Sequence, residues 1–154
     1  MNQAPTHFYD VQVHWETKRK GTLSADSLHE TITVATPPEF ANGMPGIWSP
    51  EHLLVAAVNS CLMTTFLAIA ENFKLGYAGF ESKATGKLEM VEGKYMISEI
   101  ELKPTVIIED ESLMEKAFKI LHKSEANCLI SNSIKSKIIF HPQVKLQSLT
   151  HAHD

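Results

Sequence analysis

The segment SPEHLLVAAVNSCLMTTFLAIAENF, which begins at Ser49, constrains the fold of this chain more than any other. Ser49 suits the N-cap of a helix, Pro50 suits the first helical position, and Glu51 suits the positive end of the helix dipole. These signals predict a helix that runs to about Phe73 and ends near Gly76. Its side chains are apolar around nearly the whole circumference, so a single sheet can cover only one face of it.

The uncovered face of this helix could be buried in a membrane or against another polypeptide. The longest apolar stretch, from Leu53 to Ala70, contains several polar side chains and lacks flanking anchors, which favours a buried soluble helix over a membrane span. The interrupting residues are Asn59, Ser60, Thr64 and Thr65. A second copy of the chain is the simple way to bury the remaining face, so we expect an obligate homodimer.

The rest of the chain alternates between strand-like and helix-like patterns. A second amphipathic helix shows Leu113, Ala117, Ile120 and Leu121 at helical spacing. The predicted order is β-β-β-α-β-β-α-β, an α+β fold with an antiparallel sheet around the long central helix. The expected strands cover residues 8–15, 22–26, 29–36, 80–91, 94–108 and 136–147, the second helix covers 109–126, and a short helical turn that Asn127 could cap covers 127–135.

The length and net charge of the chain limit the number of domains and the kinds of partner to expect. With 154 residues and 17.2 kDa, it is expected to form one domain over residues 1–154. A net charge of −4, with no basic run beyond KRK, argues against nucleic acid as the main partner. The N-terminus has neither the basic start nor the apolar core of a signal peptide, so we expect a cytoplasmic protein.

Two cysteines, Cys61 in the central helix and Cys128 after the second helix, could be inert core residues or a redox pair. Their separation matches no metal-binding spacing, so structural zinc is not expected. Cys61 taken alone is typical of a small buried apolar residue. Cys128 is expected at the start of a short helix, where the dipole would stabilise a thiolate, and is expected to be less buried than Cys61.

Two motifs around these cysteines resemble the Ohr/OsmC family. The stretch SPEHLLVAAVNSC, with a helix-opening Pro-Glu and a cysteine ten residues after the glutamate, is similar to the start of the family's central helix. The stretch ANCLISNSI is similar to the family segment C-P-x-S-N/Q after the second helix, with Leu129 in place of the proline. The predicted order of strands and helices fits the family along essentially the whole chain.

The resemblance implies a thiol-dependent peroxidase that reduces organic hydroperoxides, in an intertwined homodimer with two active sites at the interface. By correspondence with the family motifs, Cys61 is the peroxidatic cysteine, Cys128 the resolving cysteine and Glu51 the conserved glutamate. A thiolate would attack the peroxide, leave a sulfenic acid and then form a Cys61–Cys128 disulfide. A dithiol donor, typically a lipoyl group in the Ohr branch, would reduce this disulfide, and no cofactor is implied.

Thiolate formation at Cys61 would need help, because desolvation in an apolar helix raises the pKa of a thiol, and a nearby cation is the usual remedy. Arg19 is the only arginine of the chain, and it corresponds to the catalytic arginine that Ohr members carry in a G-G-R-x-G turn. Thr17 and Lys18 stand where that turn has its glycines. From the residues alone, this segment is a solvated basic hairpin tip.

The distance between Glu51 and Cys61 bears on how the site is assembled. Ten helical residues span roughly 15 Å, so the two side chains cannot touch along one helix. We therefore expect a site that combines Cys61 and Cys128 of one chain with Glu51 from its partner chain.

Four residues are candidates for a pocket that holds an alkyl hydroperoxide, namely Met44, Trp48, Met63 and Phe66. Ordinary core packing explains such residues as well. For the whole protein, the alternative to a peroxidase is a non-catalytic OsmC-like dimer that binds a hydrophobic ligand and has inert, buried cysteines. The C-terminal sequence HAHD offers two histidines, but a frayed tail rarely makes a specific site, so no metal is expected.

Overall fold

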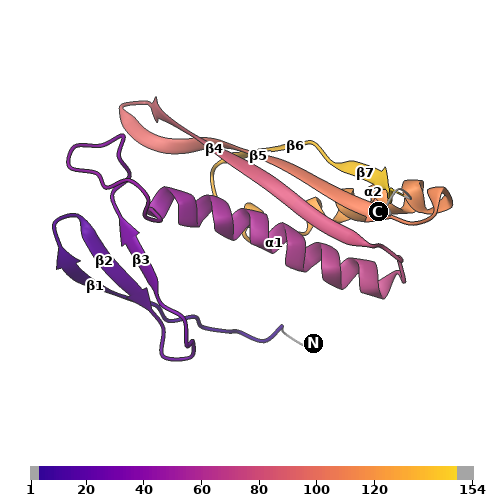
Figure 1. Cartoon of the computed structure of the whole chain (residues 1–154), viewed down its shortest axis with the longest axis horizontal. Helices are drawn as coiled ribbons and strands as arrows, with labels where there is room; N and C mark the ends of the chain where they lie inside the picture. Colours follow the sequence, from indigo (N-terminus) through magenta and orange to yellow (C-terminus); the bar gives the residue numbers. More distant parts are fainter. Residues whose placement is uncertain (1–3, 149–154) are drawn as a thin grey trace, which may run out of the picture. The chain divides into compact units, whose positions relative to one another are not determined.

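The computed structural model describes residues 4–148, and the chain divides into a first unit that extends to Leu53 and a second that begins at Leu54 (Figure 1). The order of elements is the predicted one up to the last strand, which is divided in two. The elements are β1 (Gln12–Thr17), β2 (Lys20–Ser24), β3 (Ile32–Ala35), α1 (Pro50–Asn72), β4 (Gly79–Val91), β5 (Lys94–Ile108), the 3-10 turn η1 (Glu111–Leu113), α2 (Met114–Ala126), the 3-10 turn η2 (Ser131–Ser133), β6 (Lys137–Phe140) and β7 (Gln143–Leu146).

The first unit contains an antiparallel sheet with the strand order β1-β2-β3. β1 begins later than predicted, at Gln12, which is the first residue paired with β2. A two-residue turn joins β1 to β2, and Lys18 in this turn has a φ of 51°, in the left-handed region that favours glycine. The indole N–H of Trp15 donates to the carbonyl oxygen of Lys18 over 2.9 Å, which holds the turn against its own strand.

The loop between β3 and α1 is fastened to the end of β3 at two points. The amide of Ala35 donates to the carbonyl oxygen of Trp48 over 2.8 Å, and the amide of Met44 donates to that of Thr36 over 2.9 Å. The loop therefore closes on itself and places Trp48 beside β3, directly before α1 begins.

The second unit is built on the long antiparallel hairpin of β4 and β5, as predicted. Its turn residues, Glu92 and Gly93, have φ values of 49° and 81°, as a type I′ turn requires. β5 also pairs with β6 and β7, and both of these pairings are parallel. The prediction of an antiparallel sheet is wrong at this edge, because the chain crosses over through α2 and returns in the direction of β5.

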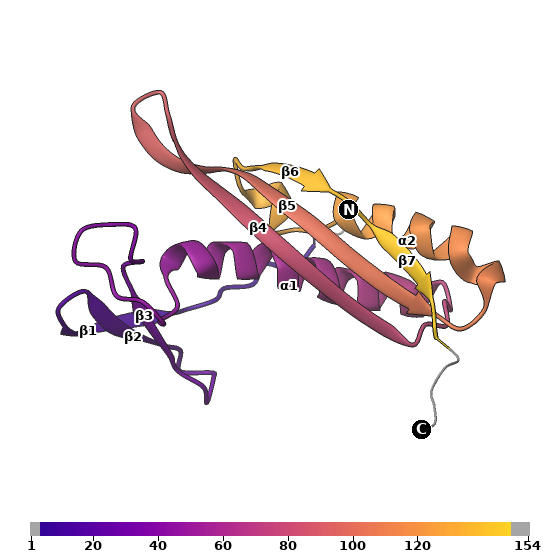
Figure 2. The same cartoon turned by 45° about the horizontal axis from the view of Figure 1, so that its top comes forward.

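The last strand was predicted as one segment but is divided into β6 and β7 at Pro142. Proline has no N–H to donate to a ladder, so the pairing pauses there. Leu102 pairs with Phe140 before the break and Thr105 pairs with Gln143 after it, so the register is unbroken. Figure 2 shows β6 and β7 following one another along β5.

α1 begins and ends close to the predicted positions. The backbone N–H of His52 donates to the hydroxyl of Ser49 over 3.1 Å, so Ser49 is the N-cap, and this hydroxyl also lies 2.7 Å from Nδ1 of His52. The helix ends at Asn72, and Lys74 just beyond it has a φ of 56°. Lys74 thus takes the left-handed conformation that often terminates a helix.

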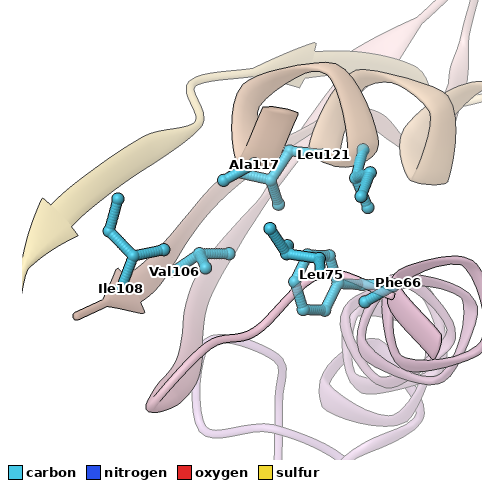
Figure 3. Close-up of a cluster of buried hydrophobic side chains, with 8 residues drawn as sticks. Phe66, Leu75, Val106, Ile108, Ala117 and Leu121 are labelled. Carbon is cyan, nitrogen blue, oxygen red and sulfur yellow. The ribbon is translucent and has the colours of Figure 1, made fainter. Parts of the chain in front are cut away.

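The core of the second unit lies between α1, β5 and α2. Val58, Leu62, Phe66 and Ala70 recur every four residues on α1 and are fully buried. Figure 3 shows that Ala117 and Leu121 of α2 face Phe66 of α1 and Leu75 beyond it. Burial of each large apolar side chain contributes about 1.5–3 kcal/mol. The partners on β5 and α2 are Ile100, Leu102, Val106, Ile108, Ala117, Ile120 and Leu121.

Much of the remaining surface of α1 is apolar and only partly covered in one chain. Met63 and Leu67 are 39% and 37% exposed. By length and composition alone, α1 could cross a membrane, and 28% of its most apolar window is buried within this chain. A core helix passes the same test, and the buried row of α1 packs against the sheet.

Candidate active site

Cys61 and Cys128 meet in the second unit, although they lie far apart in the sequence. Cys61 is half-buried on α1, directly before the buried Leu62. Cys128 follows the C-terminus of α2 and is fully buried, and its Sγ lies 4.0 Å from the carbonyl oxygen of Val58 on α1. The two thiols lie close enough to shift each other's pKa.

The turn that follows α2 supplies backbone donors to Cys61. Hydrogen bonding from the backbone of Ile130 and Leu129 lowers the pKa of Cys61. The turn is held in shape by its own hydrogen bonds, since the amide of Asn132 donates to the carbonyl oxygen of Cys128 over 3.1 Å and that of Ser133 donates to Ile130 over 3.0 Å. A short segment of fixed backbone therefore presents its N–H groups to one side of the thiol.

The two thiols have opposite pKa shifts. Burial raises the pKa of Cys61, but hydrogen bonds from the Ile130 amide, the Cys128 thiol, the Thr65 hydroxyl and the Leu129 amide outweigh it, so the pKa lies below the ordinary cysteine value. Burial raises the pKa of Cys128, and its contact with Cys61 raises it further. The arrangement therefore favours a thiolate at Cys61 and a protonated thiol at Cys128.

The expectation for the surroundings of Cys128 is wrong. Cys128 is more buried than Cys61, and its pKa is raised rather than lowered. The reason is local: the 3-10 turn begins only at Ser131, and the preceding amides donate to Cys61 instead. Asn127, expected to cap this turn, is the C-cap of α2, and its side-chain amide donates to the carbonyl oxygen of Lys123 over 2.8 Å.

Glu51 lies in the first turn of α1 and is half-buried. Its carboxylate oxygen Oε1 is buried and has no hydrogen-bond partner among the described residues. A buried carboxylate oxygen is costly without a donor or a cation. Both residues lie on α1, where the ten residues from Glu51 to Cys61 span roughly 15 Å at the ordinary helical rise.

Arg19 and Met44 line the same hollow in the first unit, whose volume is about 610 Å³. Lys18 and the loop residues 42–45 complete its lining. The side chain of Arg19 is exposed and has no ion pair within residues 4–148. One wall of this hollow is therefore cationic, and the methionine makes part of the rest apolar.

The other proposed pocket residues have different surroundings. Trp48 is 53% exposed, and its ring packs edge-on against His52 at 6.0 Å. Met63 is partly exposed on α1, two residues beyond Cys61. Phe66 is fully buried and stacks on Phe80 at 5.0 Å, which makes it a core residue of this chain.

Sequence reasoning missed the neutral donors around Cys61. Thr65 lies four residues after Cys61, and its hydroxyl oxygen is 3.9 Å from the sulfur. The i, i+4 spacing on a helix was a usable signal for this contact. The amides of Leu129 and Ile130 could not have been found in this way, because their position depends on how α2 packs against α1.

No group of three His, Cys, Asp or Glu side chains among residues 4–148 is arranged to hold a metal ion. The HAHD tail, considered above as a metal ligand, lies outside the described residues.

Comparisons with known proteins place these features in context. A family model described as OsmC-like protein matches residues 43–142. Peroxiredoxin OsmC of Escherichia coli is 30% identical over 146 residues, covering 87% of this chain and 94% of that protein. The uncharacterised protein YmaD of Bacillus subtilis is 24% identical over 140 residues, covering 88% of this chain and 91% of YmaD.

Solved structures have the same fold. An OsmC-like protein of unknown function from Vibrio cholerae matches with a TM-score of 0.80 at 23% identity, covering 89% of this chain and 99% of that one. An organic hydroperoxide resistance protein from Elizabethkingia anophelis matches with a TM-score of 0.75 at 18% identity, covering 94% of this chain and all of that one (100%). The predicted α+β fold is confirmed by these similarities.

Proposed function

The chain belongs to the OsmC-like protein family, and we propose that it is a thiol-dependent peroxidase that reduces organic hydroperoxides to alcohols. The observation that carries the proposal is the position of Cys128, whose sulfur lies 4.0 Å from the carbonyl oxygen of Val58, one turn before Cys61 on α1. The opposite pKa shifts of the two thiols favour Cys61 as the thiolate and Cys128 as the thiol. A peroxidatic and a resolving cysteine need this division of roles. Inert cysteines in a non-catalytic binding protein have no reason to meet or to differ in pKa.

The oxidative half of the cycle uses the two thiols in turn. The Cys61 thiolate attacks the terminal oxygen of the hydroperoxide, the O–O bond breaks, and the alkoxide leaves and takes up a proton to become the alcohol. Cys61 is now a sulfenic acid. The thiol of Cys128 attacks this sulfur, forms the Cys61–Cys128 disulfide and releases water. Because Cys128 already lies against α1 one turn before Cys61, closing the disulfide needs no long movement of Cys128.

The reductive half of the cycle requires an external dithiol, and we propose a lipoyl-type donor. One thiolate of the donor attacks a sulfur of the disulfide, and its second thiol then displaces the protein from the mixed disulfide. Cys128 is fully buried, whereas Cys61 is partly exposed. The donor therefore attacks Cys61, and Cys128 is the leaving thiolate.

The charged members of the site are Glu51 and Arg19, and we propose that they act together across a homodimer. The buried oxygen of Glu51 lacks a partner within residues 4–148, and the guanidinium of Arg19 has no ion pair there. A carboxylate and a guanidinium satisfy each other in bidentate geometry. In this arrangement Glu51 of one chain orients the arginine that serves Cys61 of the other.

The proposed contacts with the substrate are made by apolar side chains that are exposed in one chain. Met44 and Trp48 of the first unit and Met63 on α1 are at least partly exposed and can contact an alkyl chain. Phe66 shapes such a pocket only from within the core. A cytoplasmic location suits the cycle, because thiol donors keep cysteines reduced there.

The experiment that tests this function is steady-state turnover of cumene hydroperoxide with dihydrolipoamide as the reductant. Wild type should consume both, and Cys61→Ser should lower the rate by at least about a hundredfold, because it removes the nucleophile. Cys128→Ser should complete one turnover and then stall as the sulfenic acid. Equal turnover in wild type and Cys61→Ser would rule out the proposed role of Cys61.

A further inference from the structure

The hydroxyl of Thr65 is placed differently from the other hydroxyls on the two helices. The hydroxyls of Ser60, Thr64 and Ser124 all donate to a backbone carbonyl three or four residues earlier, over 3.3, 3.1 and 2.6 Å. This is the usual local bond of serine and threonine in a helix. Within the described residues, Thr65 makes no such bond, and its Oγ1 lies 3.9 Å from Sγ of Cys61.

Hydrogen-bonding groups approach Cys61 from two sides. Thr65 approaches its sulfur along α1, one turn further on, and the amides of Leu129 and Ile130 approach from the turn after α2. These donors belong to a helix and to a hydrogen-bonded turn, so they are in place before the thiolate forms. Together with the Cys128 thiol, all of them are neutral groups.

We propose that Thr65 and the amides of Leu129 and Ile130 form a neutral cradle that stabilises the Cys61 thiolate, with Thr65 as a further catalytic residue of the site. The inference rests on the proposed role of Cys61 as the nucleophile. It adds that activation of the thiol begins within one chain, through donors of the second unit alone. A cation supplied by Arg19 then acts on a thiolate that is already favoured.

The cradle has a direct consequence for reactivity. A hydroxyl that donates to a thiolate but gains little from a thiol favours ionisation. Replacing it with a methyl group of the same size removes the donor and keeps the packing. Thr65→Val should raise the pKa of Cys61 and lower its thiolate fraction at neutral pH by about three- to tenfold.

The test is the rate of alkylation of reduced full-length protein by iodoacetamide between pH 5 and pH 10, with the modified cysteine identified by peptide mass mapping. Alkylation at Cys61 reports its thiolate without any peroxide. Thr65→Val and Thr65→Ala should both shift the pH profile upward, and Thr65→Ser should restore it, since serine keeps the hydroxyl.

Thr64→Val is the matched control. Thr64 is the neighbouring residue, and its hydroxyl donates to the carbonyl oxygen of Cys61 rather than to the sulfur. Its loss should leave the pH profile in place. The inference is overturned by an unshifted profile in Thr65→Val, or by an equal shift in Thr64→Val. Because alkylation needs no hydroperoxide, an inactive peroxidase with a shifted profile would contradict the proposed function and leave the cradle standing.

Discussion

At the scale of single residues, the proposed chemistry depends on the difference between two cysteines. Cys61 is partly exposed and surrounded by neutral donors, whereas Cys128 is fully buried and has a raised pKa. As pH rises through the lowered pKa of Cys61, the thiolate forms there while Cys128 keeps its proton. Reaction with a hydroperoxide should therefore rise with pH earlier than for an ordinary cysteine.

The same difference predicts which sulfur an incoming thiol attacks. The lower pKa of Cys61 makes it the better leaving group, which would favour attack on Cys128. Access opposes this, because Cys128 has no exposed surface, and an attacking thiolate must approach in line with the S–S bond. We expect solvent access to outweigh the leaving-group effect. Mixed disulfides on Cys61 should then exceed those on Cys128 by about tenfold or more.

This preference can be measured with protein oxidised by diamide and then treated with glutathione, a monothiol that forms a mixed disulfide, while N-ethylmaleimide traps the cysteine that is released. Peptide mapping should find the mixed disulfide on Cys61. Protein unfolded in denaturant is the control, since both sulfurs are then accessible and the preference should fall. An adduct found mainly on Cys128 of the folded protein would contradict the proposed direction of recycling.

At the scale of elements, the sequence predicted what local patterns determine. The cap of Ser49, the extent of α1 and the bounds of the β4–β5 hairpin follow from helix signals, strand alternation and turn residues, and all are confirmed. The parallel pairing of β6 and β7 with β5 was missed, because the direction of a strand after a crossover is set by where α2 packs. The burial of Cys128 was misjudged for the same reason.

Strand β1 is the element that most clearly needs a partner. Tyr9, Val11, Val13 and Trp15 alternate along it and the residues before it, and they are 88%, 67%, 67% and 70% exposed in one chain. Alternate residues of a strand share a face, so this face is apolar and uncovered. A contiguous apolar surface of this kind usually marks an interface, and the partly exposed apolar side of α1 is a second such surface. We expect a second copy to cover both.

The dimer can be tested by analytical ultracentrifugation of the full-length chain. Wild type should sediment as a dimer of the 17.2 kDa chain. Val13→Glu places a charge on the apolar face and should shift the population toward monomer. His14→Glu, one residue along on the opposite face of the strand, is the control and should leave the dimer intact. A monomeric wild type would contradict the shared site of Glu51 and Arg19.

At the scale of the whole molecule, the proposed site divides between the two units. The second unit holds both cysteines and the neutral donors that stabilise the thiolate. The first unit holds Arg19, Glu51 and the loop with Met44 and Trp48. In the proposed function, the thiol chemistry belongs to residues of the second unit, and the proposed charged and substrate-contacting residues are mainly in the first. The sequence motifs predicted the roles of both cysteines, Glu51 and Arg19, whereas the groups around the sulfur of Cys61 were found only from the structure.

The central claim is that Cys61 reacts with a hydroperoxide and Cys128 resolves the product. The most direct measurement adds one equivalent of cumene hydroperoxide to reduced protein, without any reductant, and counts free thiols after denaturation. Wild type should lose both thiols and two hydrogen atoms of mass, as a disulfide requires. Cys128→Ser should instead carry a sulfenic acid on Cys61 that dimedone traps. The account is contradicted if Cys61→Ser consumes the hydroperoxide as fast as wild type, or if wild type keeps both thiols.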